Sequence, residues 1–574
     1  MSTDGSGDGV PLTRAQLRAL RAAEETGAVQ EPADVQEAAA VQSPAAQDAA
    51  DVQPAAAQHP APPVPLPTTP VAVPAAPDAR YIPGADTPGV GPIRGERPAS
   101  GVSAPDSYLE KARAEPGPQH DRRFAVTMLS VLGVLVLFVG VLGVVSLTQG
   151  PRIAQVQVNA QQAIETSGSR LILSANQRLE PVDAKQVTVT PAVPFTVDAA
   201  GRSIGIRFTV PLNDETKYTV SVKGAAAAGG GPTADLRTSF TTPASHILLL
   251  QRSADGDDKI FITDLDGTRA KPVFAHPHID DYRATSTLLV VVVEEDDGSR
   301  LLVMNRDGSD QRELKLPGEG YVSSVQVSDR GNLVGYSYSD RELTETSGRA
   351  SVLVTQPLSG AGKPSIVQVD GTEASVAEWQ FVPDSSSLLF IDFNGALGVE
   401  DRSADAGVKP MGIAASILGV SRGTYTAIVE RSDGSIVQLD LTNGEESALP
   451  ASDPDYGDAD TIVPFPGGTL RHIVQRDADG MPTGQAVVRV DDKGAASVVT
   501  EVSGADAILQ TCVSPSGQYA AIVVAPDLPN NAYDTLQLPL PTTLHTQLID
   551  LDGDRELPVL SGFDISWCGQ APQP

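Results

Sequence analysis

One short segment of the chain fits a nucleophile motif. Gly419, Ser421 and Gly423 stand in the order G-x-S-x-G, in which a serine on a sharp strand-to-helix turn attacks an acyl group. That chemistry needs a helix after the serine, and a histidine with an acid to activate it. The residues that follow, TYTAIVE, are typical of a strand. We therefore interpret Ser421 as part of a turn between two strands and expect no catalytic role for it.

Two further patterns contain residue types that bind metal ions. His276 and His278 flank a proline and precede Asp280 and Asp281, while the acidic runs 255–258 and 294–297 offer carboxylate oxygens of the kind Ca²⁺ prefers. The runs lack the ligand spacing of an EF-hand, and we interpret them as solvated hairpin tips. No phosphate-binding loop or dinucleotide fingerprint stands in the right context. We expect no metal, no cofactor and no enzymatic activity.

The chain has two cysteines, Cys512 and Cys568. Two thiols cannot build a cysteine zinc site or a disulfide-rich small fold. We favour a disulfide between them, which would close a loop of about 56 residues and contribute about 4 kcal/mol in the chain-entropy model. The alternative is a pair of buried free thiols.

Two recurring motifs must position all of these residues. The first is a strand that ends in an Asp-Gly-like turn, as in IFITDLDG (260–267) and LLVMNRDG (301–308). The second is an SPDG-like turn followed by an apolar strand, as in VSPSGQYAAIVV (513–524). We count seven copies of the second motif in residues 246–574, with a period of about 45 residues. The last copy, ISWCGQ, lacks its strand, and HILLLQ (246–251) at the start of the region can supply it.

This pattern predicts a ring of four-stranded blades closed by the two ends of the region, most simply a seven-bladed β-propeller over 245–574, with six or eight blades left open. The motifs resemble those of the TolB-like propellers, relatives of the WD-repeat propellers. The resemblance implies protein or ligand binding across a propeller face, and it assigns that role to no single residue.

Residues 152–244 alternate short apolar runs with turn residues, and no helix is expected there. The runs RLIL (170–173), IGIRFTV (204–210) and YTVSV (218–222) are typical of half-buried strands and favour a β-sandwich. The stretch resembles the Ig-like domain of bacterial S-layer proteins through QVTVTP (186–191), the approach to YTV (218–220) and the ending SFTT (239–242). That resemblance implies a spacer or adhesive module without catalytic residues.

Residues 124–147 carry no charge and, as a helix, would span about 36 Å, enough to cross a bilayer core of about 30 Å. Lys111, Arg113, Arg122 and Arg123 precede the segment, while Arg152 is the only basic residue close after it. The positive-inside rule therefore predicts a single-pass plasma-membrane protein with residues 1–123 cytoplasmic and the C-terminal region extracytoplasmic. The net charge of −31 argues against nucleic acid as a partner.

The N-terminal tail, residues 1–123, is rich in Ala and Pro and is expected to be disordered, with one short basic helix at 12–26. That helix has a capping box and a basic face, and the residues offered for a cytoplasmic contact are Arg14, Leu17, Arg18, Leu20 and Arg21. The helix would contact the inner leaflet or a cytosolic partner, or it would have no partner at all. It resembles the Arg-rich segments at the start of many actinobacterial membrane proteins.

These observations favour a membrane-anchored, non-enzymatic envelope protein whose propeller binds a protein or a cell-wall component, with the Ig-like module as a spacer. One alternative is an envelope hydrolase or lyase that uses the propeller channel. The other is a purely structural wall or adhesion protein.

Overall fold

The computed structural model describes residues 122–148, 150–344, 346–360, 362–404, 406–536, 539–553 and 555–573. The short basic helix predicted at 12–26, and the tail that contains it, lie outside the described residues. Residues 115–574 belong to one compact unit. Apart from one long helix, one helix of six residues and two 3-10 turns, the secondary structure of the described residues is all β.

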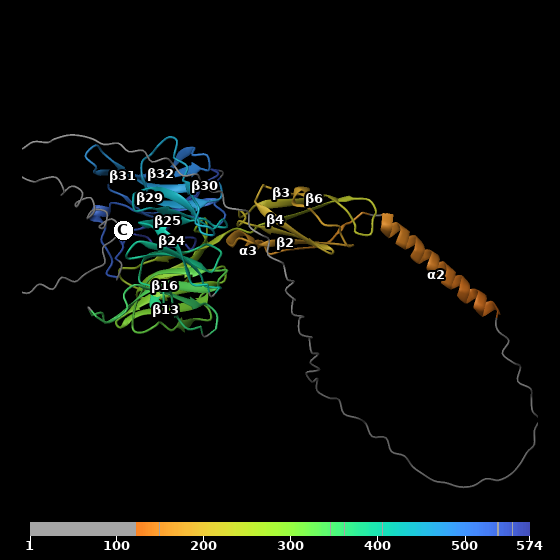
Figure 1. The fold of residues 1–574 in the computed structure, drawn as a ribbon, viewed down its shortest axis with the longest axis horizontal. Coiled ribbons are helices and arrows are strands. Elements are labelled where there is room, and N and C mark those ends of the chain that lie inside the picture. The colour runs from red at the N-terminus through yellow and green to blue at the C-terminus, as the bar shows by residue number, and fades with distance from the viewer. Residues whose placement is uncertain are drawn as a thin grey trace, which may run out of the picture. The chain divides into compact units, whose positions relative to one another are not determined.

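The first described element is the helix α2 (Arg122–Thr148), drawn as the long coil in Figure 1. The uncharged segment 124–147 lies within it. Among the described residues, the structure contains no helix with both the length and the apolar character that a membrane crossing requires. The structure therefore does not support the transmembrane prediction for 124–147.

Residues 150–244 form two antiparallel sheets around one core (Figure 1). The strands and the helix of this region, which we call the sandwich, are β1 (Ile153–Val158), α3 (Ala160–Glu165), β2 (Arg170–Ala175), β3 (Val187–Thr190), β4 (Phe195–Ala200), β5 (Ser203–Phe208), β6 (Lys217–Ala225) and β7 (Ala234–Thr241). The sheet orders are β1-β2-β5-β4 and β3-β6-β7. Alternate residues of β2, β5 and β6 are buried, as a half-buried strand requires.

The predicted strands at 170–173, 204–210 and 218–222 lie in β2, β5 and β6. The prediction that this stretch has no helix is wrong, because α3 follows β1. The side chain of Asn159 accepts a hydrogen bond of 3.2 Å from the backbone N–H of Gln162 and caps the helix. Ala163 and Ile164 are buried. A helix of six residues is too short to show a helical period in the sequence.

The remaining residues, 246–573, form what we call the sheet region. Its first sheet has three strands, β8 (His246–Gln251), β9 (Asp258–Asp264) and β10 (Lys271–His276). The next three sheets each have four antiparallel strands: β11 (Ile279–Ala284), β12 (Leu288–Glu295), β13 (Gly298–Asn305), β14 (Arg312–Leu314); β15 (Gly320–Ser328), β16 (Leu333–Asp340), β17 (Val352–Pro357), β18 (Ser365–Ile366); and β21 (Val376–Phe381), β22 (Ser387–Asp392), β23 (Ala396–Asp401), β24 (Val408–Ile413).

Three more four-stranded sheets complete the region: β25 (Ser416–Val420), β26 (Thr426–Glu430), β27 (Ile436–Asp440), β28 (Glu446–Ala448); β29 (Ala459–Phe465), β30 (Gly468–Arg476), β31 (Pro482–Asp491), β32 (Ala496–Ser503); and β33 (Ala507–Val513), β34 (Tyr519–Ala525), β35 (His545–Asp550), β36 (Val559–Ser561). A small hairpin, β19 (Gln368–Val369) and β20 (Thr372–Glu373), joins two of the sheets. Within the described residues these sheets resemble propeller blades, each formed by consecutive strands of the chain (Figure 1).

The core of the sheet region lies between neighbouring sheets. Several second strands are continuous apolar runs, such as LLVVVVEE in β12 and YAAIVVA in β34, because both of their faces pack against other sheets. Leu250 and Phe563 pair in an antiparallel bridge, which adds the C-terminal segment to the first, three-stranded sheet as a fourth position. The strand that the last motif lacks is therefore supplied from the start of the region.

The Asp-Gly turn between β13 and β14 packs closely against strand β10 of the neighbouring sheet. Gly308 has a φ of +85°, and a Cβ atom there would lie 1.9 Å from the carbonyl oxygen of Val273, so no side chain fits that position. The equivalent Gly444 and Gly553 meet nothing within 4 Å and share with Gly308 only the positive φ that favours glycine.

Candidate functional site

The sheet region has two ends, because its strands run antiparallel. The turns that join first to second strands, and third to fourth strands, all lie at one end of their sheet. The loops that join second to third strands lie at the other end. We call the first the sandwich end and the second the distal end.

Polar contacts hold the sandwich against the first of these ends. The hydroxyl of Tyr519 donates a hydrogen bond of 2.8 Å to Asp214, and the side-chain oxygen of Gln518 accepts one of 2.9 Å from the backbone N–H of Asp214. Arg306 forms an ion pair of 3.2 Å with Glu165, which ends α3. Tyr519 and Gln518 adjoin a first-to-second turn, and Arg306 stands in a third-to-fourth turn.

Further polar contacts between the sandwich and the sheet region involve residues outside the apolar core of either part. Arg555 pairs with Glu215 at 3.0 Å, and the backbone N–H of Ser167 donates to Asp384 at 3.3 Å. A Cβ atom on Gly423 would lie 2.9 Å from the carbonyl oxygen of Thr209, so this turn approaches the sandwich backbone closely. Every one of these partners in the sheet region lies in a turn at the sandwich end.

A cavity of about 180 Å³ lies between the two parts. Turns of the sheet region, with Ser328, Asp384 and Ser514 among their residues, form one wall, and the end of α3 forms another. Arg283 and Arg306 also line the cavity, and each has one buried guanidinium nitrogen without a hydrogen-bond partner, Nη2 and Nε respectively. These N–H groups could donate to a small polar ligand or to water.

Two carboxylates that line this cavity, Glu165 and Asp384, each form an ion pair with an arginine. Burial raises the pKa of the Glu165 carboxyl, and the nearby Arg306 opposes that rise. Arg422 pairs with Asp384 at 2.5 Å. The arrangement offers hydrogen bonds and ion pairs, and it places no activated nucleophile beside a base.

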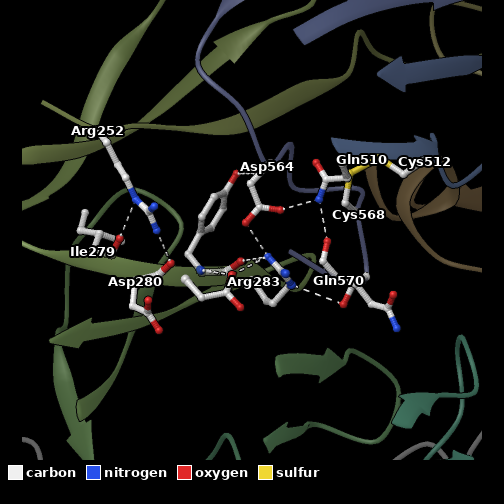
Figure 2. A network of polar contacts seen from close by, with 12 residues as sticks. Arg252, Ile279, Asp280, Arg283, Gln510, Cys512, Asp564, Cys568 and Gln570 are labelled. Atoms are coloured by element: carbon white, nitrogen blue, oxygen red, sulfur yellow. Dashed lines mark hydrogen bonds and ion pairs between the residues drawn. A yellow bond between two sulfur atoms is a disulfide. The ribbon is translucent and has the colours of Figure 1, made fainter. Parts of the chain in front are cut away.

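A buried polar network joins the first strands of two sheets, β11 and β33 (Figure 2). The side chain of Arg283, on β11, is 4% exposed and pairs with Asp281 at 2.9 Å and Asp564 at 2.7 Å. Gln510, on β33, donates to the other oxygen of Asp564 at 2.9 Å. Burial raises the pKa of Asp281 well above its usual range, while the two carboxylates keep Arg283 charged. The network joins the C-terminal segment to the first strands of two sheets.

Arg252 forms a neighbouring network with the backbone carbonyls of Ile279 and Asp280 (Figure 2). It pairs with Asp534 at 2.5 Å and donates to the backbone carbonyl of Asp280 at 2.8 Å. Burial raises the pKa of the Asp280 carboxyl to about 6, and one of its oxygens has no hydrogen-bond partner. The carboxyl of Asp280 therefore exchanges its proton near pH 6 because it is buried.

Side-chain amides also join the first strands of other neighbouring sheets. Gln326, on β15, donates to the carbonyl of Trp379 at 2.8 Å and accepts from the N–H of Phe381 at 3.0 Å. Gln380, on β21, donates to the carbonyl of Ile417 at 3.3 Å. These residues and the Arg283 network were not among the predicted site residues. Their only local signal is a polar side chain in a first strand, and β11 and β15 contain several polar residues, so the pattern does not single these side chains out.

Ser421, weighed as a nucleophile, and His276 and His278, weighed as metal ligands, lie in turns and at strand ends. The backbone N–H of Ser421 donates to the carbonyl of Thr426 at 2.8 Å, in the turn between strands β25 and β26. The ring of His276 contacts the backbone of His278 at 3.1 Å. Across the described part of the chain, no group of three or more His, Cys, Asp or Glu residues could hold a metal ion.

Cys512 and Cys568 form a disulfide with a Cα–Cα distance of 5.4 Å. Cys512 belongs to β33, the first strand of the last sheet, and Cys568 follows the segment that pairs with β8. Both side chains are buried in one cluster with Tyr519 and Leu548. The bond therefore links the last sheet to the segment that completes the first.

Large exposed apolar side chains gather at the distal end. Phe393 is 67% exposed and Leu343 is 51% exposed, each in a second-to-third loop, and Ile413 ends the fourth strand β24 at the same end. Met481 and Tyr533 are exposed in two further second-to-third loops. Among the described residues, the sandwich contacts given above all reach the sandwich end.

No protein-family model matches the chain, and no curated protein matches it either. Among solved structures it is similar to TolB from Acinetobacter baumannii, with 12% identity over 66% of this chain and 82% of that chain and a TM-score of 0.30. It is also similar to the tricorn protease, with 10% identity over 69% of this chain and a TM-score of 0.34, and the match spans 46% of that chain.

An oligogalacturonate lyase from Vibrio parahaemolyticus is similar over 51% of this chain and 91% of that chain, with 8% identity and a TM-score of 0.38. These likenesses agree with the blade-like sheets described above. They are too weak to carry an argument about activity, substrate or partner.

Proposed function

We propose that the chain is a tethered extracytoplasmic binding protein that presents one end of a seven-bladed β-propeller to a protein or a cell-wall component. The observation that carries this proposal is the division of the sheet region into two ends. Contacts from Glu165, Asp214 and Glu215 occupy the sandwich end. The distal end keeps its apolar loop residues exposed.

In this proposal the sandwich is an Ig-like spacer. It fits that role because several short polar contacts fix it to the sheet region, so that the distal end points away from the attachment. The mixed, ion-paired cavity between the two parts belongs to this joint. A spacer that was free to swing would need none of these bonds.

Two observations support the proposed compartment: the disulfide and the sequence of residues 124–147. A structural disulfide persists outside the cytoplasm and is rare within it. The uncharged segment, preceded by four basic residues, is the proposed anchor and sets the proposed orientation. Residues 1–123 would then lie on the cytoplasmic side.

The experiment that tests this function is protease protection combined with cross-linking of the full chain. In intact cells an added protease should cleave the sheet region, and in inverted vesicles it should cleave only residues 1–123. Cross-linking in the intact cells should then recover a discrete envelope protein or wall fragment. A sheet region that is protected in intact cells, or a chain that cross-links to nothing, would refute the proposal.

A further inference from the structure

We propose that the cavity between the sandwich and the sheet region binds a small neutral polyol, held by hydrogen bonds from Arg283 and Arg306. The site lies at the sandwich end, so it goes beyond the proposed function, which uses the distal end. Three observations support it: two buried donors without partners, the charge of the cavity wall, and the volume of the cavity.

Arg306 brings the first unpaired donor to the cavity. It stands in the turn between β13 and β14, where its Nη1 pairs with Glu165 at 3.2 Å and its Nη2 donates to the carbonyl of His246 at 3.2 Å. These two bonds hold the guanidinium in place, while its Nε–H is buried and has no partner. A buried donor without a partner is uncommon in folded proteins, because it costs free energy until something accepts from it.

Arg283 brings a second unpaired donor to the same cavity (Figure 2). Its Nη1 pairs with Asp564 at 2.7 Å and its Nε donates to the carbonyl of Gly569 at 3.3 Å. The side chain is 4% exposed, and its Nη2 has no partner. A molecule in the cavity would therefore have two fixed N–H groups from which to accept hydrogen bonds.

The charge of the cavity wall argues against an ionic ligand. Four carboxylates line the cavity against three arginines, namely Glu165, Asp214, Asp329 and Asp384 against Arg283, Arg306 and Arg422. Two further carboxylates, Asp281 and Asp564, pair with Arg283. An anion would therefore meet a net negative wall. A cation cannot accept a hydrogen bond, so it would leave the two arginine N–H groups unpaired.

A neutral polyol matches both the donors and the acceptors of this wall. Each hydroxyl group can accept a hydrogen bond from an arginine and donate its own to a carboxylate, which has lone pairs to spare. Hydroxyl groups also reproduce the hydrogen bonds of the water molecules that they displace. The C–H groups of the polyol would pack against Leu212 and Trp567, which line the cavity as well.

The volume of the cavity sets the size of the ligand. The cavity measures about 180 Å³, and a protein cavity of about 150 Å³ can hold one benzene molecule. A hydroxylated chain of about four or five carbons therefore fits, whereas a disaccharide is too large. Erythritol, with a hydroxyl group on each of its carbons, is a suitable probe.

The first test titrates three four-carbon probes into the purified full chain and measures the heat of binding. Erythritol is neutral, tartrate is a dianion and 1,4-diaminobutane is a dication at neutral pH. We expect saturable binding of erythritol and an affinity at least about tenfold weaker for the two ions, because one meets the carboxylates and the other cannot accept from the arginines. If either ion binds as tightly as erythritol, the site is not one for a neutral polyol.

The second test removes one donor and uses a matched control. Arg306→Met removes the unpaired Nε–H together with the ion pair to Glu165. Arg555→Met removes the ion pair of 3.0 Å to Glu215, which also joins the sandwich to the sheet region, but Arg555 is not among the residues that line the cavity. The affinity for erythritol should fall about tenfold in the first variant and less than about twofold in the second, since only the first loses a hydrogen bond to the ligand.

Two further results would overturn the inference while leaving the proposed function intact. One is an equal loss of erythritol affinity in the two variants, which would place the bound polyol outside the cavity. The other is the absence of saturable erythritol binding to the parent chain, which would show that the cavity holds water only. Cross-linking in intact cells tests the proposed function separately, because it does not depend on this cavity.

Discussion

The backbones of Leu250 and Phe563 exchange two hydrogen bonds of 2.9 Å each, so that the C-terminal segment is the neighbour of β8 in the first sheet. These residues come from opposite ends of the sheet region. Loss of this pairing would expose the edge of β8, with its four buried central residues, to water. The contacts of the C-terminal segment therefore hold it against β8 in the first sheet.

The disulfide should contribute strongly to that closure. Replacing both Cys512 and Cys568 with serine removes a cross-link between residues 56 positions apart. In the chain-entropy model this costs about 4 kcal/mol of unfolding free energy, because the unfolded chain gains freedom. Urea unfolding should show a lower midpoint for the variant. A reducing agent should lower the midpoint of the parent chain to the same value and leave the variant unchanged.

Arg283 should be essential to the stability of the sheet region. Its replacement by methionine leaves Asp281 and Asp564 buried without a cation, which costs about 3–5 kcal/mol. Burial raises the pKa of Asp281, so the loss should be smaller at low pH, where that carboxyl binds a proton and loses its charge. The matched change Arg300→Met removes an exposed ion-pair partner of Glu295 and should lower the free energy of unfolding far less than Arg283→Met does. Equal losses in the two variants would contradict this account.

Asp280 should make the stability depend on pH. Burial raises its pKa to about 6 from an ordinary value near 4, so the folded chain binds more protons than the unfolded chain between about pH 4 and 6. The free energy of unfolding should therefore fall as the pH rises through this window. The variant Asp280→Asn, measured by urea unfolding across pH 4 to 7, should have a flatter profile than the parent chain. An unchanged profile would show that Asp280 is ionised without cost.

The sequence predicts the local features of this fold better than its long-range contacts. The Asp-Gly turns and the apolar second strands recur with a period because each sheet repeats the same short-range geometry, with Gly308 as one example. The pairing of Arg283 with Asp564 joins residues 281 positions apart, and nothing in either local sequence indicates the other. The helix α3 is too short for a periodic pattern, and its cap at Asn159 was the only local signal.

The candidate site divides in the same way. Exposed acidic loops can be anticipated from runs such as 294–297, since hairpin tips are solvated. The free end of the sheets cannot be anticipated, because it depends on which turns the sandwich contacts. Those contacts involve side chains such as Asp214 and Tyr519, which come from different parts of the chain and carry no shared motif.

Asp214 should hold the sandwich in place. Its carboxylate accepts a hydrogen bond of 2.8 Å from the Tyr519 hydroxyl and one of 2.9 Å from the backbone N–H of Ser245, and it is buried. The variant Asp214→Ala leaves both donors buried without an acceptor, at a cost of about 1–3 kcal/mol. Hydrogen exchange of the Ser245 amide should accelerate, because that amide loses its partner. Limited proteolysis should then cleave the joint near residues 242–246 faster.

Two comparisons separate this local effect from a general loss of stability. Tyr519→Phe removes only one donor, so the Ser245 amide should keep its protection while the joint becomes slightly more sensitive to protease. Asp198→Ala removes an exposed carboxylate on the sandwich and should change neither measurement. If Asp214→Ala leaves the exchange of Ser245 at the parent rate, these hydrogen bonds do not fix the joint. The distal end would then be presented by the remaining ion pairs, with Glu165–Arg306 as the next pair to remove.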